Sequence, residues 1–188
     1  ALMLTPVRVP FGEYMPDLPS LDNPGALLAK NVIPAEASYK PFKTTEDFSA
    51  AVAARVLGAC AARSSAGILT IFAGTSTALF ALVSTSKTFS DATRVSGGAY
   101  SADEHWTFNQ FGDSVTAWNG VDAPQLYTLG SSTNFAALTG SPPTARYAAN
   151  AREQVMVGNV SGTPNRLQWC GVDSLTTWGT DAALQADY

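Results

Sequence analysis

A loosely repeated unit limits what this chain can fold into more than any other feature of its sequence. Three segments can be aligned with one another, residues 68–93, 114–138 and 154–178, at spacings of about 40 to 47 residues. Each contains an apolar run, a polar turn, a second run with an aromatic residue, and a closing aromatic. Short apolar runs bounded by Gly, Ser, Asn, Asp and Pro are typical of strands joined by tight turns. The repeat therefore predicts an all-β chain.

Three kinds of position match between the copies: a glycine in the turn, a leucine beside an aromatic in the second run, and the closing aromatic. In copy order they are Gly74, Gly120 and Gly162; Leu79-Phe80, Leu126-Tyr127 and Leu167 with Trp169; and Phe89, Phe135 and Trp178. The core residues predicted for the repeated sheets are Phe80, Trp118, Tyr127, Phe135, Trp169 and Trp178. The predicted strands are 68–73, 79–83, 106–111, 115–118, 125–129, 146–150, 154–158 and 166–171, and a further one at 56–62 leads into the first copy.

A period of about 40 to 50 residues with four short strands per copy is the signature of β-propeller blades. Stacking such sheets buries the apolar faces that one sheet alone leaves open. We expect three blades, at roughly 56–100, 105–140 and 146–185. Since propellers have about four to eight blades, this is a partial propeller, either one part of a longer protein, which we favour, or one completed by other chains. A β-sandwich, whose hairpins also recur regularly, is the competing interpretation.

The segment 1–45 differs from the repeated region 46–188, because it holds seven of the 11 prolines. Proline lacks the backbone donor and favours extended geometry in the residue before it, so neither a compact sheet nor a long helix is expected there. Large apolar residues punctuate the segment, which predicts an extended arm lying on a surface, its own or a neighbour's. Residues predicted to contact a neighbouring subunit are Arg8, Phe11, Tyr14, Leu18 and Leu21. A Pro-rich recognition peptide is the alternative, with one PxxP match at 16–19.

One helix is predicted, over residues 44–57. Thr44 or Thr45 can cap it, Glu46 and Asp47 suit a helix N-terminus, and Gly58 would end it.

Charge argues against a nucleic-acid binder. The net charge is −4 and the 11 Lys and Arg residues are scattered singly, whereas affinity for DNA or RNA comes largely from clustered cations that neutralise phosphates. A weakly acidic wall would instead repel phosphates and let a DNA strand slide past. Charged residues make up only 14% of the chain, which suits a protein that buries much of its surface against partners. The longest apolar stretch, 66–83, is too interrupted for a membrane span of about 20 apolar residues.

No catalytic motif is present, and we predict no enzyme activity, no cofactor and no metal. His105 lies beside Asp103 and Glu104, but a histidine in such a loop is more often a surface group than a general base. Three aspartates suggest turns, because none has the spacing of a calcium loop; they are Asp113, Asp122 and Asp173.

The four tryptophans could stack on sugars, but their place in the repeat favours core packing. Cys60 and Cys170 are expected to be buried free thiols.

Several stretches together resemble a known family. They are TPVRVPFGEYMPDLP at 5–19, NPG at 23–25, AKNVIPA at 29–35, and LQWCGVD at 167–173 followed by Thr177-Trp178. The pattern resembles the tail nozzle or hub proteins of short-tailed bacteriophages, also called packaged-DNA stabilisation proteins. The resemblance implies β-propeller subunits that form a ring, usually hexameric, below the portal and adaptor rings of a virion.

The resemblance also implies a function. Such a subunit continues the DNA channel, helps to retain the packaged genome before ejection, and offers attachment points for fibres or spikes. Its partners would be copies of itself, portal or adaptor proteins and fibre or spike proteins, with DNA only as a passing cargo and no membrane. It would be located in the virion tail after assembly in the host cytoplasm. The alternative is a host-receptor or glycan-binding propeller of a tail fibre or a secreted lectin, and a glycoside hydrolase is a third hypothesis.

Overall fold

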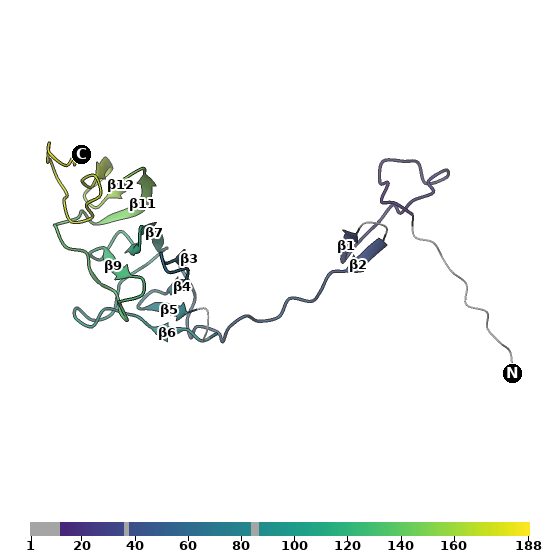
Figure 1. Ribbon diagram of the computed structural model, residues 1–188, viewed down its shortest axis with the longest axis horizontal. Coiled ribbons are helices and arrows are strands. Elements are labelled where there is room, and N and C mark those ends of the chain that lie inside the picture. The colour runs from purple at the N-terminus through teal and green to yellow at the C-terminus, as the bar shows by residue number, and fades with distance from the viewer. Residues whose placement is uncertain (1–11, 36–37, 84–86) are drawn as a thin grey trace. The chain divides into compact units, whose positions relative to one another are not determined.

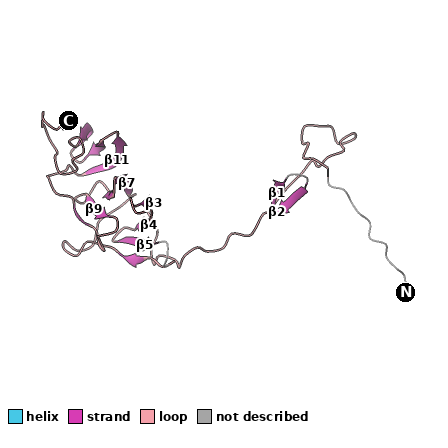
Figure 2. Ribbon diagram, viewed as in Figure 1, coloured by secondary structure: helices cyan, strands magenta, loops and turns pink. Residues whose placement is uncertain are grey.

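The computed structural model describes residues 12–35, 38–83 and 87–188. The chain divides into two compact units, Ala1–Asp47 and Phe48–Tyr188. Throughout the described ranges every regular element is a strand and none is a helix, as Figure 2 shows. The prediction of an all-β chain is confirmed.

The first unit contains a short antiparallel hairpin, which the proline content of this segment did not predict. It consists of β1 (Val32–Ala35) and β2 (Ser38–Pro41), with Val32 opposite Pro41. Proline is tolerated because each strand of a two-stranded ribbon has one unpaired edge. A separate turn is closed by two backbone hydrogen bonds, Met15 N–H to Ala26 O at 3.0 Å and Ala26 N–H to Glu13 O at 2.7 Å.

The helix predicted over residues 44–57 is wrong. These residues form bends and irregular chain up to the start of the next strand at Gly58. Phe48 is 55% exposed, so the apolar positions of the expected helix face do not pack together on a core. A helix of about this length is marginal in water without such packing.

The second unit begins with a four-stranded antiparallel meander, the first sheet. Its strands are β3 (Gly58–Arg63), β4 (Leu69–Gly74), β5 (Leu79–Val83) and β6 (Ser90–Asp91), paired in chain order. The sequence folds this way because each apolar run is followed by a polar turn, which returns the chain antiparallel to itself.

The second sheet repeats this arrangement with β7 (Thr107–Phe111), β8 (Ser114–Trp118), β9 (Gln125–Thr128) and β10 (Ala136–Ala137). The turn between β7 and β8 has only two residues and requires a positive φ, which Gly112 adopts at 57°. Glycine reaches this conformation without a steric penalty.

The third sheet has three strands, β11 (Ala145–Ala151), β12 (Gln154–Val160) and β13 (Thr163–Trp169), again in chain order. An isolated antiparallel bridge pairs Trp169 with Asp187, where the other sheets have their fourth strand. Figure 1 shows the three sheets following one another through the second unit. Every strand predicted from the repeat overlaps an observed strand.

The sheets stack on one another through their faces. We call the face that points to the next sheet along the chain the front face, and the opposite one the back face. One buried cluster joins the front of the first sheet to the back of the second, through Phe72, Leu79, Ala81, Val115, Ala117 and Tyr127. Another joins the front of the second sheet to the back of the third, through Trp118, Phe111, Leu126, Val155, Val157 and Cys170.

The pattern of buried side chains along the central strands reflects this stacking. Successive side chains of a strand point to opposite faces. In β8, Val115, Thr116, Ala117 and Trp118 are all buried, because this sheet is covered on both faces. In β12 only alternate residues are fully buried. The described sheets do not close into a ring.

Candidate interaction face

Side-chain amides connect neighbouring sheets at equivalent positions. Gln110 on β7 bonds both backbone groups of Arg63 on β3: it accepts from the N–H at 3.1 Å and donates to the C=O at 2.7 Å. Asn150 on β11 donates to the C=O of Gln110 at 2.6 Å and accepts from the Asn109 amide at 2.7 Å. Gln110 pairs with Val115 in its sheet and Asn150 with Val155 in the next, so both amides have the same place in the repeat.

His105 precedes β7 and lies against β11 of the third sheet, with its Nε2 atom buried and without a hydrogen-bond partner. Its ring stacks on Tyr147 at a centroid distance of 5.2 Å. Arg146 on β11 forms an ion pair with Glu104 and a longer one, at 3.8 Å, with Asp103. Both carboxylates beside His105 therefore face a cation, and these contacts attach the start of the second sheet to the third.

The aspartates considered as calcium ligands lie in turns or bends, and the carboxylates of Asp113 and Asp122 bind residues from other parts of the chain. Asp113 accepts from the Ser65 backbone N–H at 2.6 Å and from its hydroxyl at 2.5 Å, and these bonds lower the pKa of the carboxyl group. Asp122 pairs with Arg94 at 3.1 Å, and Asp173 has a positive φ of 51°. Among the described residues, no group of three His, Cys, Asp or Glu side chains is placed to hold a metal ion.

The aromatic residues predicted as blade core occupy two kinds of position. Trp118, Tyr127 and Phe135 are buried, and Trp178 packs against Trp118 with centroids 5.8 Å apart. Phe80 and Trp169 are only half-buried. Phe80 pairs with Ala73 on the back of the first sheet, and Trp169 pairs with Met156 on the front of the third.

The residues predicted for subunit contact are only partly described. Arg8 and Phe11 lie outside the described residues. Tyr14, Leu18 and Leu21 are exposed. Near them, Tyr39 on β2 donates a hydrogen bond from its hydroxyl to the C=O of Gly12 at 3.1 Å.

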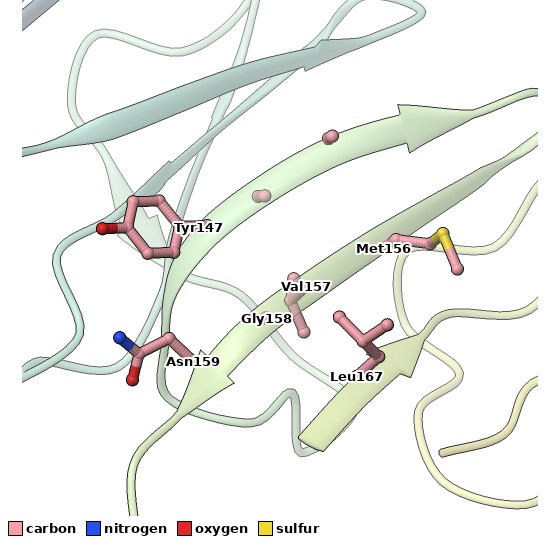
Figure 3. Close-up of a pocket in the computed structure, with 8 residues that line it drawn as sticks. Tyr147, Met156, Val157, Gly158, Asn159 and Leu167 are labelled. Carbon is pink, nitrogen blue, oxygen red and sulfur yellow. The ribbon is translucent and has the colours of Figure 1, made fainter. Parts of the chain in front are cut away.

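The front face of the third sheet carries an open apolar hollow of about 460 Å³. Figure 3 shows Met156 of β12 and Leu167 of β13 beside each other on this surface, with Tyr147 of β11 farther along it. Leu167 is 59% exposed and Tyr147 is 53% exposed. Gly158 adds no side chain between them, and Asn159 supplies polar atoms at the rim. An exposed apolar hollow of this kind is suited to bind another apolar surface.

Sequence reasoning did not identify the residues that characterise this face, Tyr147, Met156 and Leu167, as a group. Their alternation with Ala148 and Val157 along the strands was the available signal. Which of two alternating sets remains uncovered depends on where the stack ends, and neither periodicity nor composition contains that information.

No protein-family model matches this chain, and no curated protein is significantly similar to it. No helix in the part of the chain that the structure describes is long and apolar enough to cross a membrane.

Proposed function

We propose that this chain is a structural, non-enzymatic subunit of a phage virion, in the tail nozzle or hub. In that role it forms part of a ring that continues the DNA channel below the portal and adaptor and helps to retain packaged DNA. The identification of this particular assembly rests on the sequence resemblance at residues 5–35 and 167–178.

The observation that carries the structural role is the front-to-back stacking of three like sheets. Each sheet supplies a cover for its neighbour, so the design is blade-like, and we propose that the sheets are blades of a partial β-propeller. The first strands of successive sheets, β3, β7 and β11, are in contact in this order, as expected for the inner strands of stacked blades. Such a scaffold positions binding surfaces and needs no cofactor.

Protein composition of the virion tests this function. Particles of the virus that encodes the chain should contain it in a fixed ratio to the portal protein, and labelled antibodies should bind at the tail. Cryo-electron microscopy should then place three stacked sheets per subunit in a ring around the DNA channel. The proposal fails if purified infectious particles lack the chain.

A glycan-binding propeller is the second candidate, favoured by Tyr147. The Tyr147 ring stacks on His105 but is 53% exposed beside a hollow, and an exposed aromatic ring is a common contact for a sugar. Recognition of a sugar also needs several polar groups around it, whereas Asn159 is the only amide at this hollow. Binding to a glycan array that is lost in Tyr147→Ala would favour this candidate over the tail subunit.

A further inference from the structure

The two ends of the stack have apolar faces that match those buried inside it. Inside the second unit, a front face meets a back face twice, first to second sheet and second to third. The front of the third sheet and the back of the first are the two faces left without a sheet against them in the described chain. Both interfaces inside the unit have the same direction, so the pairing that continues the stack is front onto back.

On the front of the third sheet, apolar or small residues occupy the positions whose equivalents in the second sheet are covered. Met156 and Gly158 correspond in their sheet to Thr116 and Trp118, which are buried under the third sheet. Trp169 pairs with Met156 as Leu126 pairs with Thr116. Leu126 packs in the second cluster, whereas Trp169 has no sheet in front of it and donates from its indole N–H to the C=O of Gln185 at 2.8 Å.

The back of the first sheet is apolar and partly open. Ala73 and Leu82 on this face are buried, whereas Leu69 is 38% exposed and Ile71 and Phe80 are half-buried. The same face of the second and third sheets carries Val115 and Val155 at the centre of a buried cluster. Leu69 and Ile71 therefore form an apolar back face of the kind that covers a front face at both interfaces inside this molecule.

We propose that the front of the third sheet binds the back of the first sheet of a second copy of this chain. The contact is head to tail, since it joins two different surfaces, and it continues the interface that already exists between successive sheets. Two copies with three sheets each bring six sheets together, which lies within the range of about four to eight that closes a propeller. This inference deepens the proposed function and rests on its stacked-sheet part, but it is independent of the virion.

A second copy is the occupant that the chain itself specifies. Any copy presents a back face with alternating apolar side chains, as found at the internal interfaces. An unrelated flat apolar partner would not need the hollow beside Gly158, into which a branched side chain such as that of Leu69 can fit.

The test is the oligomeric state of the full 188-residue chain, measured by sedimentation velocity over a wide range of concentrations. We expect a reversible dimer for the unmodified chain. Leu167→Glu on the front of the third sheet and Leu69→Glu on the back of the first should each give monomers, since an unpaired charge buried at an interface weakens association by at least about tenfold. Val95→Glu is the matched control, because Val95 is 86% exposed in a loop outside both faces, and it should dimerise as before.

Mixing the two variants distinguishes the head-to-tail contact from a symmetric one. The Leu69→Glu chain keeps an intact front face and the Leu167→Glu chain keeps an intact back face, so an equimolar mixture should form a dimer through one joint. If two front faces bound each other, Leu69→Glu would dimerise alone and the mixture would gain nothing.

Three results would overturn the proposal: an unmodified chain that stays monomeric, a Leu69→Glu chain that dimerises normally, or a Val95→Glu chain that dissociates equally. Circular dichroism confirms that each variant is folded. If Leu167→Glu fails to fold, Tyr147→Glu replaces it, because that side chain is also on the exposed front face. Failure of dimerisation would not contradict the virion assignment, because that assignment is tested separately by the presence of the chain in purified particles.

Discussion

Single residues in this molecule are placed to let one sheet approach the next. Gly74 at the end of β4 is the clearest example. A Cβ added there would lie 2.4 Å from Cδ1 of Trp106, and the indole N–H of Trp106 donates to the C=O of Thr75 at 2.7 Å. The glycine of the first repeat copy thus makes room for the tryptophan that precedes the second sheet. The equivalent glycines of the other copies, Gly120 and Gly162, instead have positive φ angles of 79° and 78°.

Gly74→Ala is expected to destabilise the fold by about 1 to 3 kcal/mol, because Trp106 must move out of its buried position. Urea unfolding followed by tryptophan fluorescence measures the loss. Gly158→Ala is the control, since its Cβ would meet only the flexible end of Leu167, at 3.1 Å. Equal losses in both variants would contradict this explanation.

Cys60 should make stability depend on pH in the alkaline range. Burial raises the pKa of its thiol from 9.0 to about 11, so the folded state favours the protonated thiol. Its contribution is fully present below pH 9.0 and is lost as the pH rises through about 11. In Cys60→Ala, the free energy of unfolding should fall less between these two pH values than in the unmodified chain. Tyr100, whose pKa burial raises to about 12, continues the loss at higher pH in both proteins.

At the scale of the element, the second and third sheets each bind the preceding sheet through an amide side chain on their first strand. Gln110 and Asn150 bond backbone groups of the preceding sheet, while apolar side chains fill the space between the faces. Apolar burial supplies most of the free energy of such an interface, and directional amide bonds set the register of one strand against the other.

Gln110→Ala removes two hydrogen bonds to Arg63 and should cost about 1 kcal/mol, because the freed backbone groups of an exposed strand regain water. Asn150→Ala should cost a similar amount at the second interface. The measurement is chemical unfolding, with Asn165→Ala as an exposed control expected to stay within about 0.5 kcal/mol of the unmodified chain. A loss in the control as large as in Gln110→Ala would show that the amide position is not special.

The positions of the strands could be predicted from the sequence, whereas the contacts between sheets could not. Short apolar runs between turn residues defined the strands of the second unit, because pairing with a chain neighbour needs only local signals. The hairpin at 32–41 was missed since Pro34 and Pro41 suggested an unpaired chain, and the helix at 44–57 was predicted from local capping without a core to hold it. The roles of Gln110 and Leu167 could not be predicted, because they depend on which strands become neighbours and where the stack stops.

At the scale of the whole molecule, the chain consists of two compact units with a boundary after Asp47. Residues 40–48 at this boundary are all exposed. The second unit contains both buried clusters and all three stacked sheets, so it holds the features expected of an independently stable domain.

Limited trypsin digestion tests this division. The enzyme should cut early after the exposed Lys43 and the exposed Arg55, both in irregular chain before β3, and leave resistant fragments that start at Thr44 or Val56, identified by mass spectrometry. Lys and Arg residues inside the sheets should be cut much later, because the sheets must open first. Early cleavage after Arg63 or Arg146 at the rate seen after Lys43 would contradict a stable second unit.

Among the described strands of the second unit, each pairs only with the strand immediately before or after it in the chain. A ribosome therefore delivers every hydrogen-bonding partner shortly after the strand that needs it, and long loops never have to close before a sheet can form. Folding during synthesis can proceed one meander at a time, with each finished sheet serving as the template on which the next one condenses.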